Sequence, residues 1–154
     1  MKPRHHFWSS LALGGALYWA TGTSAALAGA MLGGFAIDTD HIIDQLWSIR
    51  HGAPFRRESP SAHKRDWLET YFRPRKLMRL TLVFHSYELL ALLAVVTLNL
   101  RTPFLIGLLS GCVLHLSLDL VRHHREFRSL LFYFLSFRFA HRFRREQLIK
   151  PEYQ

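Results

Sequence analysis

The chain has 154 residues, enough for one domain, and apolar residues make up 49% of it. Lys and Arg outnumber Asp and Glu by 20 to 11, and the net charge of +9 indicates an anionic partner: nucleic acid, a membrane surface or a phosphorylated substrate. The single cysteine, Cys112, excludes an intramolecular disulfide. The basic start and the apolar stretch after it resemble a signal peptide, but no normal cleavage region follows, so we expect no cleavable leader.

Two apolar segments without charge open the chain, at residues 7–20 and 24–37. Each is about 14–15 residues long, or roughly 22 Å as a helix, which is short for a hydrocarbon core of about 30 Å. The sequence "TGT" at 21–23 separates them and predicts a helical hairpin. One continuous span is the alternative, and Gly22 between two threonines disfavours it.

Two longer apolar segments follow, at residues 80–100 and 104–121, with a turn predicted at "RTP" because Pro103 disfavours a continued helix. Residues 129–137 are too few to span a membrane and should lie at the interface or pack on the bundle. The predicted fold class is therefore all-α: residues 1–154 form a single domain, an integral membrane bundle of about four membrane-embedded helices with short interfacial helices.

The distribution of basic residues predicts the orientation of this bundle. If the turns at 21–23 and 101–103 lie on one side, nineteen of the twenty Lys and Arg lie on the other, which indicates the cytoplasm. We therefore expect a multi-pass membrane protein with cytoplasmic termini, a cytoplasmic loop 39–79 and a basic tail 122–154. A soluble helical bundle, which the mean hydropathy of +0.04 would allow, is the alternative.

Parts of the loop and tail have patterns of their own. Asp38 is expected to cap a helix running to about residue 50, with Gly52 just past its end. That helix would have one apolar face suited to a membrane surface, formed by Ile42, Ile43, Leu46 and Trp47. Residues 53–65 read as a basic loop and 66–72 as a second short helix. The arginine-rich stretch 137–146 predicts an anchor to anionic lipid headgroups, with nucleic-acid binding as the less favoured alternative.

Small residues recur at a spacing of four in two of the apolar segments: Gly29 with Gly33, and Gly107 with Gly111. Such pairs let membrane helices approach closely. The alternative is that glycine is simply common in membrane helices.

Histidines and carboxylates gather at one depth of this topology, near the cytoplasmic ends of the apolar segments. His115 and Asp119 share a helix face at i, i+4, and His85 is expected to share one with Glu88 at i, i+3. Imidazole and carboxylate together suit zinc, with manganese or iron as alternatives, and ionisable side chains in membrane helices indicate a functional site. Structural hydrogen-bonded pairs are the alternative, and His5 could replace His6. The predicted metal ligands are His6, Asp38, His41, His85, His115 and Asp119.

Three motifs resemble a known family: "AIDTDH" (36–41), "FHSYE" (84–88) and "GCVLHLSLD" (111–119). They are similar in order and type to motifs of bacterial inner-membrane, predicted metal-dependent hydrolases, over roughly residues 5–125. The His-x-x-x-Asp element is distantly similar to one in the zinc-dependent phospholipase C and single-strand nuclease superfamily. The chain departs from the family at Ile37, where proline is usual, and at "LTLVF" (80–84), where His-Arg-Gly-x-Thr is usual.

The resemblance implies a metal-dependent hydrolase, in which the metal lowers the pKa of bound water and polarises a phosphoryl or acyl oxygen. Asp40 or Glu88 is the expected general base. A phospholipid or another membrane phosphoester is the expected substrate class. Two alternatives stay open: a closed structural metal site, and a lipid-binding or interaction protein without chemistry. The basic residues expected to bind the anionic substrate are Arg79, Arg122 and Arg125.

Overall fold

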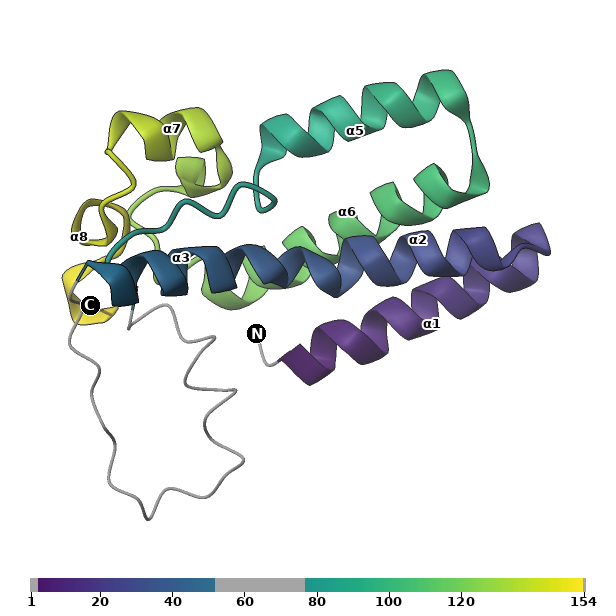
Figure 1. Ribbon diagram of the computed structural model, residues 1–154, viewed down its shortest axis with the longest axis horizontal. Helices are drawn as coiled ribbons and strands as arrows, with labels where there is room; N and C mark the ends of the chain where they lie inside the picture. The colour runs from purple at the N-terminus through teal and green to yellow at the C-terminus, as the bar shows by residue number, and fades with distance from the viewer. Residues whose placement is uncertain (1–2, 52–76, 154) are drawn as a thin grey trace, which may run out of the picture.

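The computed structural model describes residues 3–51 and 77–153, and within these ranges every regular element is a helix (Figure 1). Helices α1 (Pro3–Thr21) and α2 (Ser24–Gly34) form the predicted hairpin. Gly22 takes a φ of +67° in the turn between them, a conformation that glycine adopts at little steric cost. The Thr23 side chain accepts a hydrogen bond from the backbone N–H of Ala25 and so caps α2. The all-α prediction is confirmed for the described residues.

The second predicted hairpin is formed by α5 (Tyr87–Leu100) and α6 (Pro103–His123). Arg101 ends α5 in the left-handed conformation, and the Thr102 side chain caps α6 by accepting from the Leu105 N–H. Pro103 occupies the first turn of α6, where its missing N–H costs nothing. The predicted turn at 101–103 is therefore confirmed.

The segment before α5 is not helical, so the prediction of a helix from residue 80 is wrong. Ser86 caps α5, and residues 80–86 run outside any helix. The physical reason lies in α3 (Asp40–Arg50), because its carboxylates bind the backbone of this segment. Asp44 accepts hydrogen bonds from the N–H groups of Thr81 and Leu82, and Asp40 accepts one from Phe84. Backbone donors bound in this way are not available for helical bonds.

Helices α2 and α6 pack against each other through their glycines. A Cβ atom at Gly29 or Gly33 would collide with carbonyl oxygens of α6, and one at Gly107 or Gly111 with carbonyl oxygens of α2. This contact is the most extensive between any two described elements. The glycine pairs predicted to allow close helix approach therefore face each other across one interface.

A short 3₁₀ turn, η1 (Ala36–Thr39), joins α2 to α3, and α3 continues roughly along the direction of α2 (Figure 1). The prediction that Asp38 caps the following helix is wrong, because Asp38 lies inside η1 and its carboxylate faces histidines instead. Three residues of the predicted apolar face of α3, Ile42, Ile43 and Leu46, are 47–62% exposed, while Trp47 is only partly exposed and lies under the Arg79 guanidinium. Gly52 and the predicted elements at 53–65 and 66–72 lie outside the described residues.

The C-terminal region folds over the end of the bundle from which α3 extends (Figure 1). It comprises η3 (Leu130–Tyr133), α7 (Leu135–Ala140), α8 (Arg145–Leu148) and η4 (Pro151–Tyr153). As predicted for residues 129–137, this region packs on the bundle. Its side chains form one hydrophobic core with side chains of residues 77–82 and one residue of α6. The core residues are Leu77, Leu80, Leu82, Leu116, Phe132, Tyr133, Leu148 and Ile149.

The outer surfaces of the bundle helices are rich in exposed apolar side chains. Examples on α1, α5 and α6 are Trp8, Trp19, Leu92, Val95, Leu98, Val113 and Val121, which are 45–89% exposed. Among the described residues, α6 is the one helix long and apolar enough to cross a membrane, while α5 is apolar but has only 14 residues.

Candidate metal centre

Four separate parts of the chain bring histidine and aspartate side chains to one place. His6 comes from the first turns of α1, and His115 and Asp119 come from the second half of α6. The turn η1 and the start of α3 supply Asp38, Asp40 and His41, while the non-helical segment before α5 supplies His85. All six predicted metal ligands therefore meet in one cluster, which we call the His/Asp cluster: His6, Asp38, His41, His85, His115 and Asp119.

The centre of the cluster is the meeting point of two imidazoles. The Nε2 atoms of His85 and His115 lie 3.0 Å apart, and both rings are almost fully buried. Asp38 Oδ1 lies 3.5 Å from the first of these atoms and 3.4 Å from the second. Asp119 Oδ2 lies 3.7 Å and 3.4 Å from the same two atoms. Two nitrogen and two oxygen donors thus converge on one small volume.

The outer nitrogens of both rings have hydrogen-bond acceptors of their own. His115 Nδ1 lies 2.8 Å from the carbonyl oxygen of Gly34, and His85 Nδ1 lies 3.0 Å from Asp40 Oδ2. Neither oxygen can donate, so each Nδ1 carries the hydrogen and each neutral ring has a lone pair on Nε2. Two such lone pairs at 3.0 Å repel each other unless a cation, either a proton or a metal ion, lies between them. Carboxylate or carbonyl acceptors behind the ligating histidine are characteristic of metal sites.

The remaining ligands surround this pair. His6 Nε2 lies 3.2 Å from Asp119 Oδ1, and the His6 ring stacks on the His115 ring at 3.9 Å. His5 is exposed, so the structure places His6 in the cluster and leaves His5 at the surface. His41 Nε2 lies 3.8 Å from Asp38 Oδ1.

Three overlapping trios within the cluster have ligand atoms that all lie within 4.8 Å of one another. They share members, so they describe one ligand-rich volume and not three separate sites. The trios are His6, Asp38 and His115; Asp38, His41 and His85; and His85, His115 and Asp119.

The electrostatics of the cluster favour a cation. Burial acts to raise the pKa of Asp38, but hydrogen bonds from His115 and His85 outweigh it and hold that pKa well below its usual range. Burial acts to lower the pKa of His85, but its hydrogen bonds to Asp38 and Asp40 raise it to about 10. Burial lowers the pKa of His41 to about 4, so His41 is neutral and able to act as a ligand at pH 7. At pH 7 the metal-free cluster therefore holds a proton on His85 beside an ionised Asp38, and a divalent ion that displaces this proton would find carboxylate and imidazole ligands.

The two predicted general bases lie in different surroundings. Asp40 is buried beside the cluster, where it holds His85 and the Phe84 N–H and so orients a ligand. Glu88 does not share a helix face with His85, because α5 begins only at Tyr87. Both Glu88 carboxylate oxygens bind the start of α7, accepting from the backbone of Leu135 at 2.8 Å and of Ser136 at 2.9 Å. The structure therefore brings neither carboxylate into the centre of the cluster.

The three arginines predicted to bind substrate are also elsewhere. The Arg79 guanidinium lies over the Trp47 ring at 4.6 Å and donates to the Arg142 carbonyl. Arg122 and Arg125 are exposed at the end of α6. Within the described ranges, none of the three forms a hydrogen bond or ion pair with the His/Asp cluster.

One residue that the sequence did not single out supports the site. Arg138 is fully buried and donates to the carbonyls of Leu82, at 2.9 Å, and His85, at 3.2 Å. The predicted lipid anchor at 137–146 is therefore wrong for this arginine. Burial lowers the pKa of Arg138 to about 10, which still leaves the side chain charged at pH 7. No periodicity in "FRFAHRF" distinguishes Arg138 from its exposed neighbours, so only the tertiary structure reveals it.

A second contact that supports the site, between α3 and the segment before α5, could have been predicted from the sequence. Asp40, Asp44 and Ser48 recur at intervals of four and so share one face of α3. That face binds the segment before α5: Asp44 accepts from Thr81 at 2.7 Å, and Ser48 accepts from the Met78 N–H at 3.1 Å. The polar stripe on a helix otherwise rich in exposed apolar residues could have predicted an internal partner.

Comparison of the chain with protein-family models, with curated proteins and with solved structures finds no match in any of the three. The functional interpretation therefore depends on the geometry of the His/Asp cluster.

Proposed function

We propose that the protein is a membrane-embedded, metal-dependent hydrolase that acts on a phosphoester of a lipid or of another membrane-associated anionic substrate. The observation that carries this proposal is the pair of buried Nε2 atoms of His85 and His115, 3.0 Å apart, whose Nδ1 atoms both have acceptors. Such a pair is arranged to bind a cation, and the nearby carboxylates of Asp38 and Asp119 match a divalent ion. Zinc is the expected metal, with manganese and iron as alternatives.

A bound divalent ion would lower the pKa of a coordinated water and polarise a phosphoryl oxygen. The residues of the chain have separate tasks around it. Asp40 and the Gly34 carbonyl fix the orientation of the two central imidazoles. Asp38 and His41 are the ligands with the most accessible side chains, 14% and 13% exposed, so substrate would approach from their side. Asp119 Oδ1 lies 3.2 Å from His6 Nε2 and so holds the His6 ring beside the central pair.

The membrane location is part of the same proposal. Large apolar side chains are exposed along α1, α5 and α6, well beyond what an aqueous surface usually carries. Helix α6 has 21 residues, about 31 Å at 1.5 Å per residue, and matches a hydrocarbon core. The N-terminus, the loop 39–79 and the tail 122–154 would then face the cytoplasm of a bacterial inner membrane, together with the cluster. These segments contain every Lys and Arg of the sequence except Arg101.

The direct test is the metal content of purified protein, measured by elemental analysis, together with cleavage of a soluble phosphodiester and of phospholipid vesicles. We expect a stoichiometric divalent metal in the unmodified protein, and loss of both metal and cleavage in His85→Ala and His115→Ala. His6→Ala and His5→Ala form a matched pair, because the two histidines are neighbours and only His6 is buried. We expect His6→Ala to lose metal and His5→Ala to keep it. Absence of stoichiometric metal in the unmodified protein would refute the proposal.

One observation favours a non-catalytic role as the second hypothesis. His6, His85 and His115 are 1–2% exposed, and six ligands could close the coordination shell around an ion that only stabilises the fold. X-ray absorption spectroscopy separates the two hypotheses. A shell of protein ligands alone, with no cleavage of either substrate, indicates a structural site, whereas three or four protein ligands plus water indicates catalysis.

A further inference from the structure

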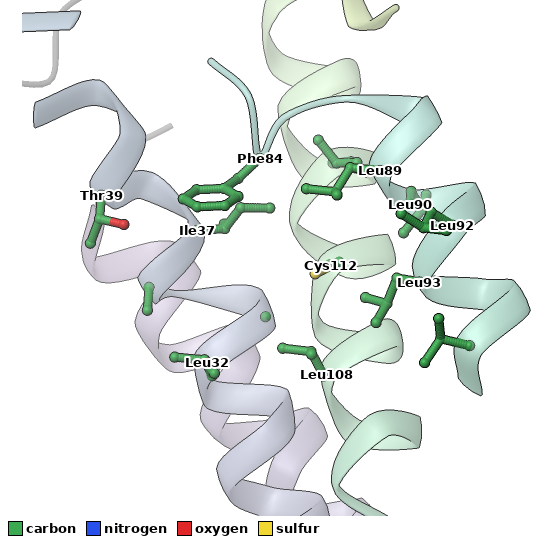
Figure 2. Close-up of a pocket in the computed structure, with 14 residues that line it drawn as sticks. Leu32, Ile37, Thr39, Phe84, Leu89, Leu90, Leu92, Leu93, Leu108 and Cys112 are labelled. Atoms are coloured by element: carbon green, nitrogen blue, oxygen red, sulfur yellow. The ribbon is translucent and has the colours of Figure 1, made fainter. Parts of the chain in front are cut away.

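An apolar groove runs along α6 between α2 and α5 (Figure 2). Its volume is about 640 Å³, within the roughly 300–1,000 Å³ typical of small-molecule sites. Its walls are almost entirely leucine, valine, isoleucine and phenylalanine, and Thr39 and Cys112 are the polar side chains among its lining residues. The groove therefore suits a hydrocarbon ligand and offers little to a polar one.

One end of this groove is lined by residues that adjoin members of the His/Asp cluster in the chain, although no cluster residue is itself among the lining residues. Ile37 and Thr39 flank Asp38 in the chain, and Phe84 and Leu116 are the neighbours of His85 and His115. Figure 2 shows Ile37, Thr39 and Phe84 together at this end. The backbone on both sides of Asp38, one of the two most accessible ligands, therefore borders this end of the groove.

The other end of the groove lies toward the turn between α5 and α6. Leu32 and Leu108 lie at this end in Figure 2, and Val96 lines it from the second half of α5. From Leu108 to Leu116 the groove follows eight residues of α6, or about 12 Å. At its rim, Leu32 and Leu92 are 49% and 59% exposed, continuous with the apolar outer surface of the bundle. A ligand could therefore enter sideways from a membrane without crossing water.

We propose that this groove is the binding site for one acyl chain of a membrane phospholipid, whose phosphoester then lies at the His/Asp cluster. This inference rests on the proposed function for the role of the cluster. It adds which part of the substrate the protein recognises. The juxtaposition is what a phospholipid requires: an apolar groove open to the side and, at its cytoplasmic end, a cluster able to hold a metal that binds phosphate oxygen. Because the groove follows α6 for about 12 Å, only an acyl chain long enough to reach its distal end gains the apolar contacts there.

Two adjacent valines of α5 provide the test. Val96 lines the distal end of the groove, whereas Val95 is 56% exposed and is not among the lining residues. Val96→Trp should fill the distal end, and Val95→Trp adds the same bulk outside it. Retention of dipalmitoyl-phosphatidylglycerol and of its dihexanoyl analogue would be measured by native mass spectrometry on the full chain in detergent. Metal content and thermal unfolding would be recorded for both variants.

We expect Val96→Trp to weaken retention of the palmitoyl lipid about tenfold, the factor for losing the burial of about two methylene groups. Retention of the hexanoyl lipid should be unchanged, and Val95→Trp should leave both lipids unaffected. Equal effects of the two substitutions, or equal loss of both lipids in Val96→Trp, would overturn the proposal. If Val96→Trp does not fold, Leu108→Phe with Leu109→Phe as its control makes the same test from α6.

The hydrolase proposal and the acyl-chain site are refuted by different results. If a soluble phosphodiester is not cleaved by metal-loaded protein but lipid retention follows the predicted pattern, the hydrolase proposal fails and the acyl-chain site stands. If the soluble diester is cleaved but both valine variants retain both lipids like the unmodified protein, the acyl-chain site fails and the hydrolase proposal stands.

Discussion

Helix α6 meets two of its neighbours, α2 and α5, in opposite ways. Against α2 it packs backbone to backbone, because four glycines let the two backbones come into contact. Against α5 it packs through longer side chains, and a groove of about 640 Å³ remains open along that side. The α2 side of α6, which we call the tight side, places His115 Nδ1 2.8 Å from the Gly34 carbonyl and so determines the ring orientation in the cluster. We call the α5 side the open side.

The comparison separates two requirements of a binding site. Ligands for a metal must be held to within a few tenths of an ångström, which the glycine-lined interface supports. A substrate needs room, which the α5 side supplies. If this division is correct, changes on the tight side should disturb both stability and metal binding, while equivalent changes on the open side should disturb neither strongly.

The largest effect is expected from Gly107→Ala on the tight side. Its Cβ would collide with the backbone of Ala26, so we expect a loss of about 3 kcal/mol in unfolding free energy and loss of bound metal. Gly15→Ala is the control, because a Cβ there meets nothing within 4 Å, and it should gain up to about 1 kcal/mol from helix propensity. Thermal unfolding followed by circular dichroism measures both. Equal tolerance of the two substitutions would contradict the described interface.

The next largest effect is a pH dependence of stability and metal affinity at the His/Asp cluster. The pKa of His85 is raised from 6.5 to about 10, because its hydrogen bonds to Asp38 and Asp40 outweigh burial. In metal-free protein its protonation therefore contributes stability that is complete below pH 6.5 and lost as the pH rises through 10. A metal must displace this proton, so apparent metal affinity should rise with pH over the same window.

Unfolding temperature with and without a chelator, from pH 6 to 10, checks this prediction. The stabilisation by metal should grow with pH, by an amount on the order of a few kcal/mol in total. A stabilisation that shrinks as the pH rises would show that His85 is not displaced by the metal.

A smaller effect is expected from Asp40→Asn. The amide oxygen can still accept from His85 Nδ1, so the geometry is kept while the negative charge behind the ring is lost. We expect metal affinity to fall about 10–100-fold, as for other outer hydrogen-bond partners of ligating histidines. Competition titration with a metal indicator gives the affinity. Asp44→Asn is the control on the same helix face, since Asp44 holds backbone N–H groups and no histidine.

The smallest effect is expected on the open side, from Leu93→Ala. Leu93 lines the groove and is only partly buried, so we expect a cost of about 1 kcal/mol and unchanged metal content. Leu80→Ala, at a site only 1% exposed in the C-terminal core, should cost about 2–5 kcal/mol. A Leu93→Ala cost as large as that of Leu80→Ala would mean that the open side is as tightly packed as the core.

Much of the fold could be predicted from the sequence, because its signals are local. The "TGT" and "RTP" turns, the hairpins around them and the length of α6 follow from Gly22, Pro103 and uninterrupted apolar runs. The pairing of His115 with Asp119 on one face follows from helix periodicity alone. These features depend on residues within a few positions of one another, and the chain specifies them without reference to distant segments.

The tertiary structure alone decided the rest. Four features depend on partners far apart in the sequence: the start of α5 at Tyr87, the position of Asp40 behind His85, the binding of Glu88 to the start of α7, and the burial of Arg138. Asp40 and His85 are 45 residues apart, and Arg138 and His85 are 53 apart. Spacing in the sequence determines which side chains share a helix face. Only the packing of the helices determines which faces meet and which nitrogen of each imidazole is left to bind a metal.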